Sequence, residues 1–157
     1  MGFASLARFF REQLTPQSPE EKEGEHHHRI RLATASVLLE TAYADQSMST
    51  REQEDIIEYL RQRFELEPDD ARELLETAEE HRAHTIDHFA MTNLLRQNLS
   101  LADRIEIVRE MWRLVYGDGS LHQYENHLVR KLADLLGLEH HVMIEAKLEV
   151  QKELAGG

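Results

Sequence analysis

The chain has no cysteine among its 157 residues. It therefore cannot form disulfides, use a thiolate nucleophile or build a cysteine-ligated zinc site, and this composition is typical of a reducing compartment. Strand signals are also missing, because no Asn-Gly hairpin joins segments of alternating polarity. Apolar residues instead recur with helical spacing along most of the chain. These features predict one all-α domain.

Long hydrophobic runs are absent as well. The longest runs from Leu32 to Leu39 and is interrupted by Thr34 and Ser36, far short of the roughly 20 residues of a transmembrane helix. The N-terminus has no basic segment followed by an apolar one, so no secretion signal is expected. We expect a cytoplasmic protein without a transmembrane segment.

Positive charge is in the minority, with 18 basic against 30 acidic residues and a net charge of -12. Nucleic-acid binding draws its affinity from clustered Lys and Arg, so this balance argues against DNA and RNA as partners. An acidic surface is compatible with cations, with basic partners or simply with solubility.

Residues 1–24 are predicted to form an N-terminal helix and an acidic linker, separate from a domain over 25–155. Apolar side chains form one stripe on residues 3–14, with Arg8 and Arg11 opposite. This helix could pack on the domain or make peripheral contact with a membrane. Pro16, Pro19 and Gly24 indicate a linker over 15–24.

About eight helices are expected in the whole chain. A central helix is predicted from Glu25 to Ala44, because its apolar face is wide. Ser49 with Glu52 forms a capping box that opens the next helix, and Pro68 stands at a first helical turn. Further helix ends are predicted at Ser100, at Gly117 to Gly119, and at Gly137, where a left-handed cap is expected.

An internal repeat relates the two halves of the domain. The segments Y-A-D-Q-S-M (43–48) and Y-G-D-G-S-L (116–121) align without a gap, and Glu52 then matches Glu125. The hydrophobic positions that follow also match, up to Leu66 with Leu138 once one residue is skipped. Each copy reads as helix, acidic turn, helix, short turn, helix.

Two explanations fit the repeated acids. The first is helix-terminal chemistry, in which the Asp caps backbone donors and the Glu faces the next helix N-terminus. The second is a hard-cation site for Ca²⁺ or Mg²⁺ at Asp118 and Glu125, and less well at Asp45 and Glu52. These are not EF-hand loops, because the Glu follows the Asp by seven residues rather than eleven.

The run W-R-L-V-Y-G-D-G-S-L-H-Q-Y-E-N-H-L-V-R-K-L-A-D-L-L-G-L (112–138) resembles the signature of the TerB-like family, named for bacterial tellurite resistance. The run L-L-E-T-A-Y-A-D-Q-S-M-S-T-R-E (38–52) resembles the family's other acidic turn. The chain is most similar to a proteobacterial branch of small standalone TerB-like proteins, over residues 26–150.

This resemblance implies an all-helical fold in which two acidic turns pack the copies together. It also implies a role in binding metal ions or partner proteins, near the membrane or in stress responses. The family's acidic residues fall on Asp45, Glu52, Asp118 and Glu125. The sequence departs from the family at Gln46, where the family favours Gly.

Histidines supply a weaker alternative metal site. His81, His84 and His88 would share one face of a continuous helix, and they could then act as ligands of a zinc or nickel ion. The segment H-T-I-D-H (84–88) also echoes a metalloprotease motif, with Asp in place of Glu. His26 to His28 are consecutive, so they point in different directions and are expected at an exposed helix entry.

The function predicted from the sequence is that of a non-enzymatic TerB-like protein, which binds an unidentified protein partner in a stress or tellurite-resistance type of system. The alternative is a divalent-cation-binding protein that uses the two acidic turns. A histidine-liganded metallohydrolase is the third possibility. No phosphate-binding loop, dinucleotide fingerprint or nucleophile elbow is present.

Overall fold

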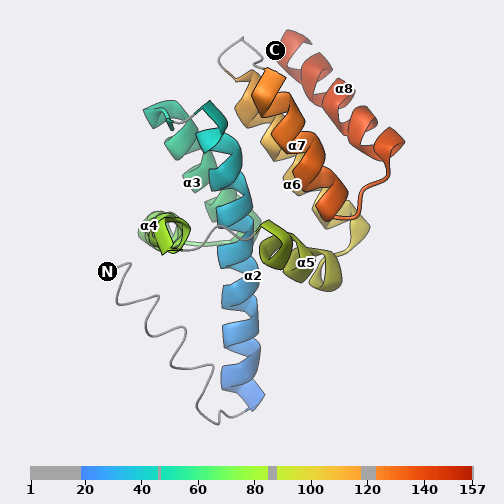
Figure 1. Cartoon of the computed structure of the whole chain (residues 1–157). Coiled ribbons are helices and arrows are strands. Elements are labelled where there is room, and N and C mark those ends of the chain that lie inside the picture. The colour runs from blue at the N-terminus through green and yellow to red at the C-terminus, as the bar shows by residue number, and fades with distance from the viewer. Residues whose placement is uncertain (1–18, 46, 85–87, 118–122, 157) are drawn as a thin grey trace.

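The computed structural model describes residues 19–45, 47–84, 88–117 and 123–156. This part of the chain is entirely helical, as predicted, and contains no strand. It forms seven α-helices and one short 3-10 helix (Figure 1): α2 (Pro19–Ala42), η1 (Tyr43–Asp45), α3 (Thr50–Phe64), α4 (Pro68–His84), α5 (His88–Asn98), α6 (Leu101–Tyr116), α7 (Gln123–Leu135) and α8 (His140–Gly156). The eighth helix expected, over 3–14, lies outside the described residues.

Helix α2 is the centre of the fold, as its wide apolar face predicts. Every residue from 32 to 42 is buried, because α3 and α4 cover one side of α2 while α5, α6 and α7 cover the other (Figure 1). The hydroxyls of Thr34 and Thr41 donate to the carbonyls of Ile30 and Val37, so these polar groups are satisfied without leaving the helix. Helix α8 packs on the outer side, mainly against α6.

The first turns of α2 differ from the prediction. The helix begins at Pro19, whereas the sequence predicted a linker through Gly24. Proline is tolerated at the first helical position, where its missing N–H costs nothing, and acidic residues in the first turn of a helix are favoured by the positive end of the helix dipole. One glycine inside a helix costs only about 1 kcal/mol, so Gly24 does not end α2.

Local sequence signals place the starts of α3, α4 and α6 correctly. Ser49 and Ser100 have extended backbones, and each side chain accepts from the amide three residues later, at 3.1 Å from Glu52 and from Asp103. Pro68 is the first residue of α4. These ends were predictable because each cap depends on residues within one turn.

The internal repeat is visible in the turn that follows the second helix of each copy. Glu65 ends α3 with φ 53°, and Gly137 follows α7 with φ 83°, so both adopt the left-handed conformation. The amide of Leu66 donates to the Arg61 carbonyl at 2.9 Å, and that of Leu138 donates to the Ala133 carbonyl at 3.1 Å. Both are the six-to-one bond of a Schellman motif, which confirms the predicted cap at Gly137.

This shared turn allows a matched pair of predictions. We expect Gly137→Ala to lower the free energy of unfolding by about 1–2 kcal/mol, the cost of a left-handed residue that carries a Cβ. We expect Glu65→Gly to raise it by about 0.5–1 kcal/mol, because that strain is removed. Urea unfolding of both variants tests this, and equal effects in the same direction would contradict it.

None of the helices in the described ranges is long and apolar enough to cross a membrane. The peripheral membrane contact predicted for residues 3–14 falls outside these ranges and stays a prediction.

Candidate functional site

The acidic turns are only partly described. Asp45 is the last residue of η1, which packs near α7, so the first turn lies beside the second copy of the repeat. Glu125 lies in the first turn of α7, but its side chain, like that of Asp45, is outside the described part. Gln46 and Asp118 also lie outside the described residues. The cation site at Asp118 and Glu125 therefore stays a prediction.

Glu52 is the one predicted cation ligand in these turns whose side chain is described, and it serves as a helix cap. Its carboxylate accepts from the Ser49 amide at 3.0 Å, and its own amide donates to the Ser49 hydroxyl at 3.1 Å. This is the reciprocal capping box expected from the sequence. A carboxylate oxygen committed to a backbone donor is a poorer ligand for a cation.

We expect Glu52→Ala to lower the free energy of unfolding by about 1 kcal/mol, the usual cost of a lost cap. The loss should be the same in chelator and in millimolar Ca²⁺ or Mg²⁺, as measured by thermal unfolding. A loss that appears only with the cation would instead identify Glu52 as a ligand.

The histidines are divided between two helices. His81 and His84 belong to α4, whereas His88 is the first residue of α5. Residues 85–87, between the two helices, lie outside the described part, so the histidine site stays a prediction. The side chain of His84 lies outside the described part. His26 to His28 lie inside α2 rather than at its entry, because the helix starts at Pro19.

His88 instead joins a polar group that we call the Glu40 cluster: Glu40, Tyr43, Glu79, Arg82 and His88. The Glu40 carboxylate, only 9% exposed, lies 2.7 Å from Arg82 Nε and 3.3 Å from His88 Nε2. The Arg82 guanidinium lies 4.3 Å from the centre of the Tyr43 ring, and the Tyr43 hydroxyl donates to Glu79 at 3.1 Å. The cluster thus links α2, η1, α4 and α5.

The Glu40 cluster is built for structure more than for metal binding. Arg82 occupies one Glu40 oxygen, and a guanidinium stays charged and repels cations. Among the residues whose positions are described, no group of three or more His, Cys, Asp or Glu is arranged to hold a metal ion. The contact between His88 and Glu40 instead positions the first turn of α5, in which Phe89 is the next residue.

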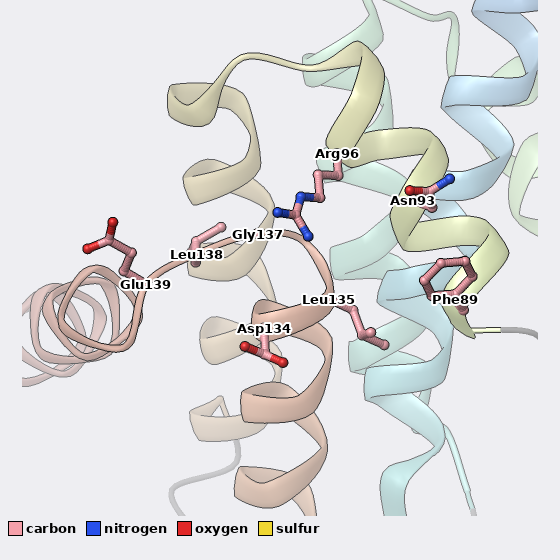
Figure 2. A pocket seen from close by; sticks show the side chains of 8 residues that line it. All are labelled: Phe89, Asn93, Arg96, Asp134, Leu135, Gly137, Leu138 and Glu139. Atoms are coloured by element: carbon pink, nitrogen blue, oxygen red, sulfur yellow. The ribbon is translucent and has the colours of Figure 1, made fainter.

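Phe89 is the most exposed large apolar residue of the described part, at 65%. It borders a pocket of about 350 Å³ between α5, the end of α7 and the α7–α8 turn (Figure 2). Leu135 points from α7 toward the Phe89 ring, and Leu138 contributes to the lining from the turn. We call this the Phe89 pocket. The sequence did not single out Phe89.

Charged and amide side chains surround the apolar part of the Phe89 pocket. Asn93 and Arg96 line it from α5, and Asp134 and Glu139 line it from the ends of α7 and the turn (Figure 2). Arg96 lies against Gly137, where an added Cβ would be 2.9 Å from its Nε. The left-handed glycine therefore shapes the pocket as well as ending the helix.

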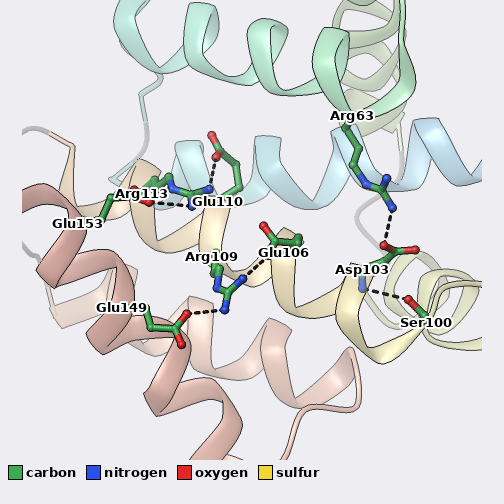
Figure 3. Close-up of polar contacts among 9 residues, drawn as sticks. All are labelled: Arg63, Ser100, Asp103, Glu106, Arg109, Glu110, Arg113, Glu149 and Glu153. Carbon is green, nitrogen blue, oxygen red and sulfur yellow. Dashed lines mark hydrogen bonds and ion pairs between the residues drawn. The ribbon is translucent and has the colours of Figure 1, made fainter.

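A layer of ion pairs holds α8 on α6 (Figure 3). Arg113 donates from Nε to Glu153 at 2.8 Å and from Nη1 to Glu110 at 3.3 Å, and Arg109 pairs with Glu106 and Glu149. The two arginines lie four residues apart on α6, as do their partners on α8, so they form two successive rungs.

Glu110 is the buried member of this layer. Burial raises its pKa from the ordinary 4.5 to about 7, although Arg113 opposes the shift, while Asp55 and Glu153 add to it. Tyr59 of α3 lies near Glu110, and burial raises its pKa well above the usual 10. Its hydroxyl has no hydrogen-bond partner within the described ranges. The sequence did not single out Glu110.

The fold and the site define a class: an all-helical protein made of two related helical units, with an aromatic side chain exposed beside a pocket. The model of the family described as "Tellurite resistance protein TerB" matches residues 31–148. The chain belongs to this family, which confirms the resemblance seen in the sequence. Neither a curated protein nor a solved structure matches the chain.

Proposed function

We propose that this TerB-family protein is a non-enzymatic interaction module of the cytoplasm, acting in a stress or tellurite-resistance type of system, and that a partner protein docks at the Phe89 pocket. The observation that carries the proposal is the exposure of Phe89. An aromatic ring left 65% exposed beside a pocket that Leu135 and Leu138 also line can serve as an interface anchor, because aromatic side chains are enriched in the buried centre of protein interfaces.

The composition of the pocket also supports a protein ligand. Apolar side chains in the middle with polar side chains around them are the usual anatomy of a protein interface. The polar clusters elsewhere do not compete with this interpretation, because Glu40 contacts Arg82 of the neighbouring helix α4 and Glu110 contacts Arg113 of its own helix. Such contacts fit a structural role.

The cation-binding alternative has less support. Glu52 is committed to its capping box, and no observation on the described side chains favours Ca²⁺ or Mg²⁺ at the turns. A cation at 100 times its dissociation constant would stabilise the chain by about 2.7 kcal/mol if it bound only the native state. If a cation stabilised the unmodified chain but not the Asp118→Ala, Glu125→Ala double variant, cation binding at the acidic turns would be favoured.

We expect Phe89→Ser to weaken binding of the partner at least tenfold, because exposed aromatic anchors carry much of the energy of an interface. The partner is first captured from a bacterial extract on the immobilised chain, then purified, and its affinity is measured by calorimetry. The fold should be unaffected, since substitutions at exposed positions change stability by about 0.5 kcal/mol or less.

The matched control is Leu148→Ser, which removes another exposed apolar side chain, 57% exposed, from α8. It should bind the purified partner as the unmodified chain does. If Phe89→Ser captured the same proteins with the same affinity, docking at the Phe89 pocket would be excluded.

A further inference from the structure

The Phe89 pocket restricts what its partner can be. This inference rests on the proposed function, because it takes the pocket to be the docking site. A volume of about 350 Å³ lies at the lower end of the roughly 300–1,000 Å³ typical of small-molecule sites. It therefore suits one or two inserted side chains better than a large cofactor.

The surrounding backbone restricts the mode of binding. Extended peptides bind by adding a strand to an open sheet edge, and the described part of the chain has no sheet. The walls of the pocket are α5 and the end of α7 (Figure 2). A segment that lies between two helices and inserts apolar side chains is the helix-in-groove mode, which an amphipathic helix fits.

Charges of both signs flank the apolar centre, and one of them, Glu139, already lies 3.4 Å from His141. Arg96 lines the pocket from α5 and Asp134 lines it from α7. Neither has an ion-pair partner among the side chains that the structure describes. A ligand that covers both walls would therefore meet a cation on one side and an anion on the other.

We propose that the Phe89 pocket takes an amphipathic helix of a partner protein, whose bulky apolar anchor stands between an acidic and a basic residue. The anchor inserts beside Phe89 and Leu135. The acidic residue of the partner pairs with Arg96 and the basic one with Asp134. These pairs set specificity more than affinity, because exposed ion pairs contribute only about 0.2–1 kcal/mol each.

Three synthetic peptides test this on the full chain. Each has 18 residues, an Ala-rich helical scaffold with blocked ends, and a central Leu. They differ only one turn before and one turn after the Leu, where they carry Lys and Glu, two Lys, or two Glu. Binding is followed by fluorescence anisotropy of a labelled peptide. The Lys/Glu peptide should bind three- to fivefold tighter than either other peptide, the change expected for one lost pair.

Reversing charges in the protein should reverse the preference. Asp134→Lys should favour the two-Glu peptide, and Arg96→Glu should favour the two-Lys peptide. Phe89→Ser should weaken all three at least tenfold, while Leu148→Ser should change none. If these charge reversals left the ranking of the three peptides unchanged, the proposal would be overturned. It would also be overturned if the chain self-associated and Phe89→Ser abolished that association, because the pocket would then hold a second copy of the chain.

The outcomes separate this inference from the proposed function. If the peptides fail to discriminate while the purified partner still requires Phe89, only the chemistry assigned to the partner is wrong. If Phe89→Ser leaves the binding of both peptides and partner unchanged, the docking site itself is wrong.

Discussion

Glu40→Ala is expected to lower the free energy of unfolding by about 2–4 kcal/mol. Removing one member of a buried ion pair leaves its partner uncompensated, which costs about 3–5 kcal/mol when both are fully buried. The Glu40 side chain is 9% exposed, but Arg82 is 33% exposed and can regain some water, so the expected loss extends below that range. Chemical unfolding monitored by circular dichroism measures it.

Glu79→Ala is the matched control within the same cluster. Glu79 accepts one hydrogen bond, from the Tyr43 hydroxyl at 3.1 Å, and losing such a bond should cost about 1 kcal/mol. Hydrogen exchange should also show faster opening of the first turn of α5 in Glu40→Ala, because His88 loses its contact there. Equal losses for the two variants would show that Glu40 is not the centre of the cluster.

The second large effect is a pH dependence at Glu110. Its pKa is about 7 in the folded chain and about 4.5 when unfolded. Between these values the folded chain keeps a proton that the unfolded chain has released, so raising the pH lowers the free energy of unfolding. The pKa shift corresponds to a contribution of about 2–4 kcal/mol to the free energy of unfolding. This contribution is fully present below pH 4.5 and is lost as the pH rises through 7.

Glu110→Gln removes this titration with little change of shape. We expect the variant to gain about 2–4 kcal/mol relative to the unmodified chain between pH 4.5 and pH 8, measured by urea unfolding at each pH. Glu153→Gln is the control, because Glu153 is exposed and its hydrogen bond to Arg113 lowers its pKa. A stability difference between Glu110→Gln and the unmodified chain that stayed constant with pH would contradict the assignment.

The helix ends were predictable because their signals are local. Ser49, Ser100, Pro68 and Gly137 each act within about one turn of chain, and each marks a helix end in the structure. The start of α2 was misread because a proline and a glycine near acidic residues look the same in a linker and in a first helical turn. The helix dipole and the packing of the helix decide whether such a segment is a linker or a first helical turn. Neither can be read from the identity of one residue.

The candidate site was less predictable because it depends on contacts between distant segments. Glu40 is the only charged residue in the buried range 32–42, a signal that could have been noticed, but Arg82 and His88 follow 42 and 48 residues later. At 100° per residue, Phe89 lies about 120° around the α5 axis from the buried Leu95, so it falls outside the buried stripe.

Helix α5 belongs to neither copy of the repeat, and this has a consequence for stoichiometry. A chain made of two related halves would ordinarily present each of its surfaces twice. The left-handed turn does occur twice, at Glu65 and at Gly137, and α5 lines the Phe89 pocket together with the second of these turns. The inserted helix thus breaks the symmetry of the duplication, and a chain that binds at the Phe89 pocket takes up one partner rather than two.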